Sequence, residues 1–111
     1  MPDTIDTSVL DELEEAVGAE FLAELIETFL VEAPGMMAEM EAGKETGDAD
    51  ALRRAAHSLK SNATTFGATR LAEVARGIEL EGLGASPDAA LASVAQALDD
   101  ARTALRGRLD G

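Results

Sequence analysis

The sequence contains no cysteine, tryptophan or tyrosine, and aromatic residues make up only 3% of its 111 residues. The absence of cysteine excludes disulfide bonds and thiolate chemistry, and it is compatible with the cytoplasmic location that we expect. With a single histidine and no thiolate, a conventional transition-metal site lacks ligands, so we expect no bound metal or cofactor. No run of about 18 apolar residues could cross a membrane, and the acidic N-terminus lacks the features of a signal peptide.

Positive charge is also scarce. The chain has 9 lysine and arginine residues against 22 aspartate and glutamate residues, which gives a formal net charge of −13. Such a chain repels nucleic acid and anionic lipid, so we expect neither as a partner, although acidity by itself most simply favours solubility. The few basic residues nevertheless gather around the only histidine, His57: Arg53, Arg54 and Lys60 are close to it, and Arg70 and Arg76 follow.

The composition predicts an all-α fold. Alanine, leucine and glutamate dominate, and no β-branched run alternates with a period of two. We expect a short first helix that is capped by Thr7 or Ser8 and ended by Gly18. The apolar spacing then predicts a long second helix over about 19–45, kinked at Pro34 because proline cannot complete the helical hydrogen-bond pattern.

Three further helices are expected after the second. Asp48 is a good N-cap for the third, whose apolar stripe is closed by Gly67, and the fourth ends in the glycine-rich stretch 82–84. The fifth begins with Pro87 at its first position, after a serine cap. Four long helices with short links predict an antiparallel four-helix bundle with a short extra N-terminal helix, in a single domain spanning 1–111.

One face of the third predicted helix does not belong to the core. Residues three, four, seven and eleven positions apart share a helix face, and here they combine basic, hydroxyl and imidazole side chains. A solvated face in so acidic a chain would more often alternate glutamate with lysine, although a chance polar face with one histidine would also explain this row by itself. The row consists of Arg53, His57, Lys60, Ser61 and Thr64.

The expected hairpin between the third and fourth helices brings a carboxylate to this face. Residues equidistant from the turn of an antiparallel pair lie at the same height, and His57 and Glu79 are equidistant from position 68. Glu79 is therefore expected to reach the imidazole and orient it. Arg76 is level with Lys60, so the alternative is that Glu79 faces solvent or pairs with Arg76.

These groups suit phosphoryl chemistry. A neutral imidazole is a nucleophile near neutral pH, and a carboxylate that accepts the hydrogen bond of Nδ1 leaves the lone pair of Nε2 free to attack. Lys60 is expected to neutralise charge on the phosphoryl group, and Ser61 is small enough to give a bulky partner access. No group here would act as a base on water, so a phosphoramidate on His57 could persist.

Residues 56–68 read A-H-S-L-K-S-N-A-T-T-F-G-A, which resembles the signature of the histidine-containing phosphotransfer (HPt) domain family. The resemblance extends from about residue 5 to 107 and places the family's polar partner on the next helix at Glu79. It departs from the family at one position, where many members have glycine and this chain has serine. The matching elements are His57, Leu59, Lys60, Ser61, Phe66 and Gly67.

The resemblance implies a protein of a two-component phosphorelay, in which His57 shuttles a phosphoryl group to and from aspartates of response-regulator receiver domains. A sensor histidine kinase is a further partner that it implies. We expect a monomeric phosphocarrier without kinase or hydrolase activity of its own, and Mg²⁺ on the receiver rather than on this chain. Partner contacts are expected from Arg53, Arg54, Thr64 and Arg76, with some of Ile5, Val9 and Leu10 near the same surface.

Two alternatives belong to other classes. A non-catalytic helical-bundle adaptor that binds signalling proteins would have the same core and acidity, but it would not need His57, Lys60 and Glu79 together. A metal-dependent enzyme is less well supported, because no loop has the spacing of a Ca²⁺-binding EF-hand. The acidic cluster of Glu12, Glu14 and Glu15 is more simply a solvated helix face, and no glycine-rich phosphate loop indicates a kinase.

Overall fold

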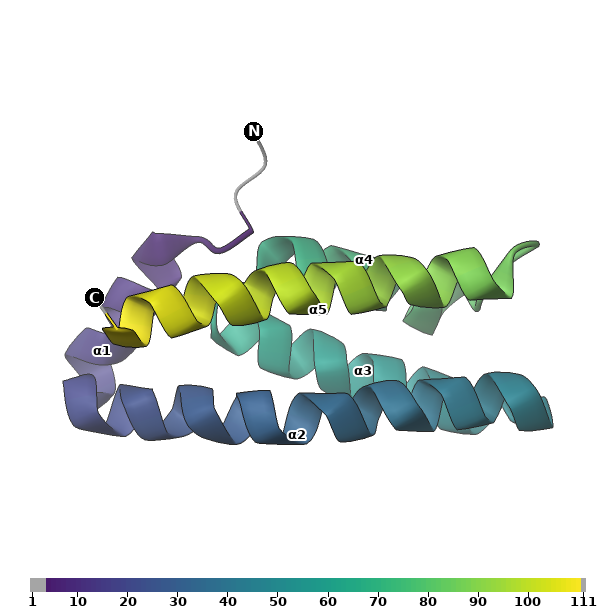
Figure 1. Cartoon of the computed structure of the whole chain (residues 1–111), viewed down its shortest axis with the longest axis horizontal. Coiled ribbons are helices and arrows are strands. Elements are labelled where there is room, and N and C mark those ends of the chain that lie inside the picture. The colour runs from purple at the N-terminus through teal and green to yellow at the C-terminus, as the bar shows by residue number, and fades with distance from the viewer. Residues whose placement is uncertain (1–3, 111) are drawn as a thin grey trace.

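The computed structural model describes residues 4–110, which form five α-helices and no strand (Figure 1). Helices α2 to α5 make an antiparallel bundle in which α3 packs against α2 and α4, and α5 packs against the same two helices. Helices α3 and α5 therefore lie diagonally opposite each other, and the short α1 packs on α2. This confirms the predicted all-α bundle with an extra N-terminal helix. The bounds are α1 Thr7–Val17, α2 Ala19–Thr46, α3 Ala49–Thr65, α4 Thr69–Glu81 and α5 Pro87–Asp110.

The helix caps follow local side-chain chemistry. The Asp48 carboxylate accepts a hydrogen bond from the backbone N–H of Ala51 at 3.0 Å and caps α3, as predicted. The predicted cap of α1, Thr7 or Ser8, is wrong by one or two residues, because Asp6 caps this helix. Its carboxylate accepts from both the backbone N–H and the hydroxyl of Ser8, at 3.1 and 2.6 Å. These bonds hold the pKa of Asp6 below its ordinary value, and an ionised carboxylate is the stronger acceptor at a helix N-terminus.

Helix α2 continues through Pro34. Proline lacks an N–H and cannot donate to the carbonyl four residues earlier, which favours a break. The apolar residues before and after Pro34 nevertheless stay in phase: Ala33 and Met40 are both fully buried. Both halves of α2 therefore bury the same face, and tertiary packing holds the helix together across the proline.

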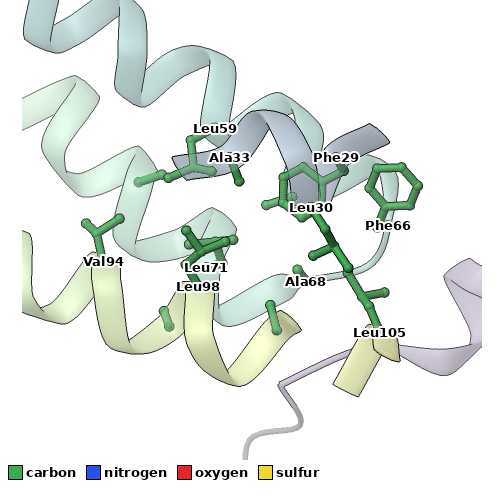
Figure 2. Packing of buried hydrophobic residues seen from close by; sticks show 14 of the residues in the cluster. Phe29, Leu30, Ala33, Leu59, Phe66, Ala68, Leu71, Val94, Leu98 and Leu105 are labelled. Carbon is green, nitrogen blue, oxygen red and sulfur yellow. The ribbon is translucent and has the colours of Figure 1, made fainter. Parts of the chain in front are cut away.

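The core is filled by side chains from all four long helices. Figure 2 shows Phe29 of α2, Leu71 of α4 and Leu105 of α5 directed into the same interior. The rings of Phe29 and Phe66 stack with centroids 5.3 Å apart and an interplanar angle of 26°. Among the helices described, none is long and apolar enough to span a membrane.

The segment before α1 folds back over the turn between α3 and α4. The backbone N–H of Asp6 donates to the carbonyl of Gly67 at 2.7 Å. Ile5 and Leu10 are only 9% and 1% exposed and belong to the core. The expectation that some of these apolar residues lie near a partner surface is therefore wrong for Ile5 and Leu10, because both are buried in the core. Val9, in the first turn of α1, is partly buried.

Candidate functional site

His57 projects from the solvent-facing side of α3. The opposite side of this helix is anchored in the core by Leu52, Ala55, Ala56, Leu59 and Ala63. The predicted polar row therefore lies on the outer face of α3, where the His57 side chain is 57% exposed. The imidazole is presented to solvent on a rigid helix, which suits a group that must enter a pocket of another protein.

Glu79 reaches His57 from the neighbouring helix α4. Its Oε2 lies 2.6 Å from Nδ1 of the imidazole, and its side chain is 16% exposed. This is the contact that the height argument about the α3–α4 turn predicts. Glu79 therefore neither faces solvent nor pairs with Arg76.

Lys60 binds the other oxygen of the same carboxylate. Its Nζ lies 2.7 Å from Oε1 of Glu79, so one carboxylate joins the ammonium and the imidazole. The Lys60 ammonium and, more weakly, the hydrogen bond with His57 hold the pKa of Glu79 below its ordinary value, against the opposing effect of burial. Glu79 is thus an anion at neutral pH and can accept the hydrogen of Nδ1–H, and in that tautomer of the neutral imidazole Nε2 has the free lone pair.

The ion pair between Lys60 and Glu79 was not predicted from the sequence. The register of the hairpin places Lys60 level with Arg76, one helical turn from Glu79. A lysine side chain is long enough to span that turn and reach the carboxylate of Glu79. The length of the lysine side chain is therefore the feature that would have indicated this ion pair.

The other predicted site residues are placed around this centre. Arg53 is exposed and pairs with Asp50 at 2.8 Å, and the Thr64 hydroxyl donates to the carbonyl of Lys60 at 2.9 Å. Ser61, Arg54 and Arg76 are exposed, and within residues 4–110 neither of these two arginines forms an ion pair. The structure thus gathers the predicted residues on one face. Arg53 has an ion-pair partner there, whereas Arg54 and Arg76 have none among the described residues.

Leu80 was not singled out from the sequence. It follows Glu79 on α4 and is 64% exposed. The buried stripe of α4 is formed by Leu71, Ala75 and Ile78, so Leu80 falls outside that stripe. A leucine out of phase with its helix is the sequence signal that would have marked it as a surface group beside the site.

Within residues 4–110, no group of three or more histidine, aspartate and glutamate side chains is arranged to bind an ion. The imidazole, the carboxylate and the surrounding cations are the polar groups on this face.

Comparison with known proteins agrees with this geometry. The Hpt domain family matches residues 24–107, about three quarters of the chain. A crystal structure of histidine-containing phosphotransfer protein B (HptB) from Pseudomonas aeruginosa PAO1 superposes with a TM-score of 0.90 at 24% sequence identity, covering 99% of this chain and 97% of that one. At this identity the superposition shows a shared fold. No curated protein sequence matches the chain.

Proposed function

The chain belongs to the Hpt domain family, and from this premise we propose that it is a phosphocarrier that accepts a phosphoryl group on His57 and passes it on. The observation that carries the proposal is the state of the imidazole. His57 is exposed, its Nδ1–H is held by an ionised Glu79, and its Nε2 is free. An imidazole so arranged is oriented as a nucleophile without any further catalytic group.

The reaction follows from this arrangement. Nε2 attacks the phosphorus of an aspartyl phosphate on a receiver domain, a bond forms between nitrogen and phosphorus, and the phosphorus–oxygen bond to the aspartate breaks. The aspartate leaves as a carboxylate, and the imidazole keeps its Nδ1 proton and becomes cationic. The Glu79 carboxylate at 2.6 Å balances that new positive charge. The reverse reaction returns the phosphoryl group to a second aspartate by the same steps.

Lys60 and Ser61 have supporting roles in this proposal. Lys60 adds positive charge beside the reacting group, and in the unphosphorylated protein it directs that charge to Glu79. A direct contact between Lys60 and phosphate would require this ion pair to open. Ser61 is exposed one helical turn from His57 and leaves room for the partner.

The proposed partners are response-regulator receiver domains, with a sensor histidine kinase as a further donor. Their proposed docking surface is the exposed face of α3 and α4 around His57, and Mg²⁺ would be bound by the receiver. We further propose that the chain acts as one monomeric phosphotransfer domain in the cytoplasm. The contact residues are Arg53, Arg54, Thr64, Arg76 and the exposed Leu80.

The test is phosphoryl transfer to the full chain from receiver domains of the same genome that have been charged with radiolabelled acetyl phosphate. The wild-type protein should take up an acid-labile, base-stable label, and His57→Gln should take up none. A protein that binds receivers but gains no label would be the non-catalytic adaptor instead. Label retained in His57→Gln would show that the acceptor lies elsewhere.

A further inference from the structure

His57 divides the exposed face of α3 into two sides. On the side of α4, Arg53 lines a shallow hollow together with Ile78 and Glu79. On the side of α2, Arg54 lines a second hollow together with Glu39 and Ala42 of that helix, among others. Residues seven apart lie on the same side of a helix, so Lys60 belongs with Arg53, and Ser61 belongs with Arg54.

The nitrogen that carries the phosphoryl group faces away from α4. The two nitrogens of an imidazole lie on different edges of the ring and point in divergent directions. Because Nδ1 is 2.6 Å from Oε2 of Glu79, Nε2 is directed away from that carboxylate. The ammonium of Lys60 is bound to Oε1 of the same carboxylate, so it lies on the Nδ1 side of the ring. A phosphoryl group on Nε2 would project on the other side, where Arg54 and Ser61 lie.

The groups on that side are available as donors. Arg53 is paired with Asp50 and Lys60 with Glu79, whereas Arg54 has no ion pair in the part of the chain that the structure describes. A guanidinium presents a planar set of N–H donors that matches phosphate oxygens.

The hydroxyl of Ser61 is similarly available. Three polar side chains that follow it on α3 each donate to the carbonyl four residues earlier, at 2.9 to 3.0 Å; they are Asn62, Thr64 and Thr65. Among residues 4–110, the Ser61 hydroxyl makes no such bond. Since the Cα–Cβ bond in a helix tilts toward the N-terminus, this hydroxyl leans back toward the turn of His57.

We infer that Arg54 and Ser61 bind the phosphoryl group on Nε2 of His57, and that Lys60 is a positioning residue that holds Glu79 against Nδ1. This inference rests on the proposed phosphocarrier function and names the groups that stabilise the phosphorylated state. It gives the two adjacent arginines different tasks: Arg54 contacts the phosphoryl group, and Arg53 does not.

Phosphoramidate is the probe that separates this contact from receiver docking, because it is a small donor that needs no partner protein. Nε2 attacks its phosphorus, the nitrogen–phosphorus bond of the donor breaks, and ammonia leaves. The phosphorylated full chain is then followed by ³¹P NMR over a pH titration, and uptake is timed. Arg53→Ala is the matched control for Arg54→Ala, because both remove one arginine from the same turn.

Removal of a cation that contacts the phosphoryl group favours its protonated form, so the ³¹P titration midpoint should rise in Arg54→Ala. It should stay near the wild-type value in Arg53→Ala and move less in Lys60→Ala. Uptake should slow roughly tenfold in Arg54→Ala, as for one exposed charged hydrogen bond, and Arg54→Lys should recover part of the loss. Ser61→Ala should give a smaller rise of the midpoint.

The inference is overturned if Arg54→Ala titrates like the wild type, or if Lys60→Ala shifts the midpoint more than Arg54→Ala does. Either result would leave the phosphocarrier function in place, because His57 would still be labelled. A wild-type protein with no phosphohistidine signal, or a label on His57→Gln, would instead remove the proposed function and this inference together. Circular dichroism of each variant checks that the fold is intact.

Discussion

At the scale of single residues, one carboxylate serves two groups. Glu79 binds the imidazole of His57 through one oxygen and the ammonium of Lys60 through the other. The ammonium keeps the carboxylate ionised, and the ionised carboxylate selects the tautomer in which Nδ1 carries the hydrogen. Lys60 therefore affects His57 indirectly, because it keeps Glu79 ionised and Glu79 in turn orients the imidazole.

The first prediction concerns the order of the two Glu79 variants. Glu79→Gln keeps an oxygen that can accept from Nδ1 but loses the charge that balances the phosphorylated imidazole. Glu79→Ala loses both. Phosphoryl uptake should slow in each, more in the alanine variant, and by less than about a hundredfold because the site is open to solvent. ¹⁵N NMR of the imidazole should show a mixed tautomer in Glu79→Ala; an unchanged tautomer would remove the orienting role.

The second prediction concerns Lys60. In Lys60→Ala the carboxylate of Glu79 loses its ammonium partner and becomes free to change rotamer. Phosphoryl uptake should therefore slow, because the hydrogen bond from Nδ1 of His57 to Glu79 is less well held. The stability cost should be about 1 kcal/mol or less, since this ion pair is partly exposed. Urea denaturation measures the stability, and phosphoryl-transfer assays stopped at successive times measure the rate. An unchanged transfer rate would show that Lys60 has no part in the reaction.

The third prediction follows from the lowered pKa of Glu79. A carboxyl group with a lower pKa in the folded than in the unfolded state stabilises the fold above its unfolded pKa, about 4.3 for glutamate, and loses that contribution as the pH falls through the folded value. Glu79→Gln should therefore be less stable than the wild type at pH 7, and the difference should disappear near pH 3. Glu73→Gln, an exposed change on the same helix, is the control in urea denaturation and should show no such difference.

At the scale of secondary-structure elements, the α3–α4 hairpin sets the register of the site. Its turn contains Gly67, which has a φ of +71° and whose carbonyl accepts from the N–H of Asp6. A Cβ at Gly67 would lie 2.7 Å from the backbone oxygen of Asp6 and 3.0 Å from Cβ of Val9. The turn is therefore held against the segment before α1.

The fourth prediction is that Gly67→Ala destabilises the protein more than Gly47→Ala does. Both glycines have a φ of +71°, where a side chain costs roughly 1–2 kcal/mol. Nothing lies within 4 Å of the position of a Cβ at Gly47, whereas at Gly67 the N-terminal segment must also move. The expected loss is about 2 kcal/mol or more for Gly67→Ala, measured in urea. Equal losses of unfolding free energy in the two variants would show that the segment before α1 can move aside without a cost in stability.

At the scale of the whole molecule, the negative charge is distributed unevenly. Helices α3 and α4 hold five of the nine basic residues but only four of the 22 acidic ones. Helices α3 and α4 together therefore have a net charge of about +1, and the rest of the chain accounts for all of the negative net charge. A negatively charged partner would meet less repulsion at the α3–α4 face than at the other faces.

The fifth prediction is that salt stabilises the protein near pH 7. Repulsion among the excess carboxylates opposes folding, and salt screens it. Raising NaCl from 10 mM to 500 mM should raise the Tm by a few degrees, as about 1 kcal/mol corresponds to roughly 4–8 °C in a small domain. Near the sequence pI of 4.2 the rise should be much smaller, which is the control. A Tm that falls with salt would mean that pairs between helices, such as Lys44–Asp88 at 2.6 Å, outweigh the repulsion.

Local sequence patterns were sufficient to predict the helices and the position of the reactive group. Apolar spacing and the cap at Asp48 predicted α3 and its outward face, and that face contains His57. The turn near position 68 was enough to place Glu79 beside it, since both partners belong to one hairpin. These features depend on contacts between near neighbours in the chain, for which helical geometry alone sets the distances.

Features that depend on side-chain length and on packing between distant segments could not be predicted from the sequence. The pairing of Lys60 with Glu79 is one of several conformers open to a long side chain, and residue spacing does not rank these conformers. The burial of Ile5 and Leu10 depends on surfaces that other helices supply. Free energy gained by packing the whole core outweighs local propensity at these places, so they become defined only when the bundle forms.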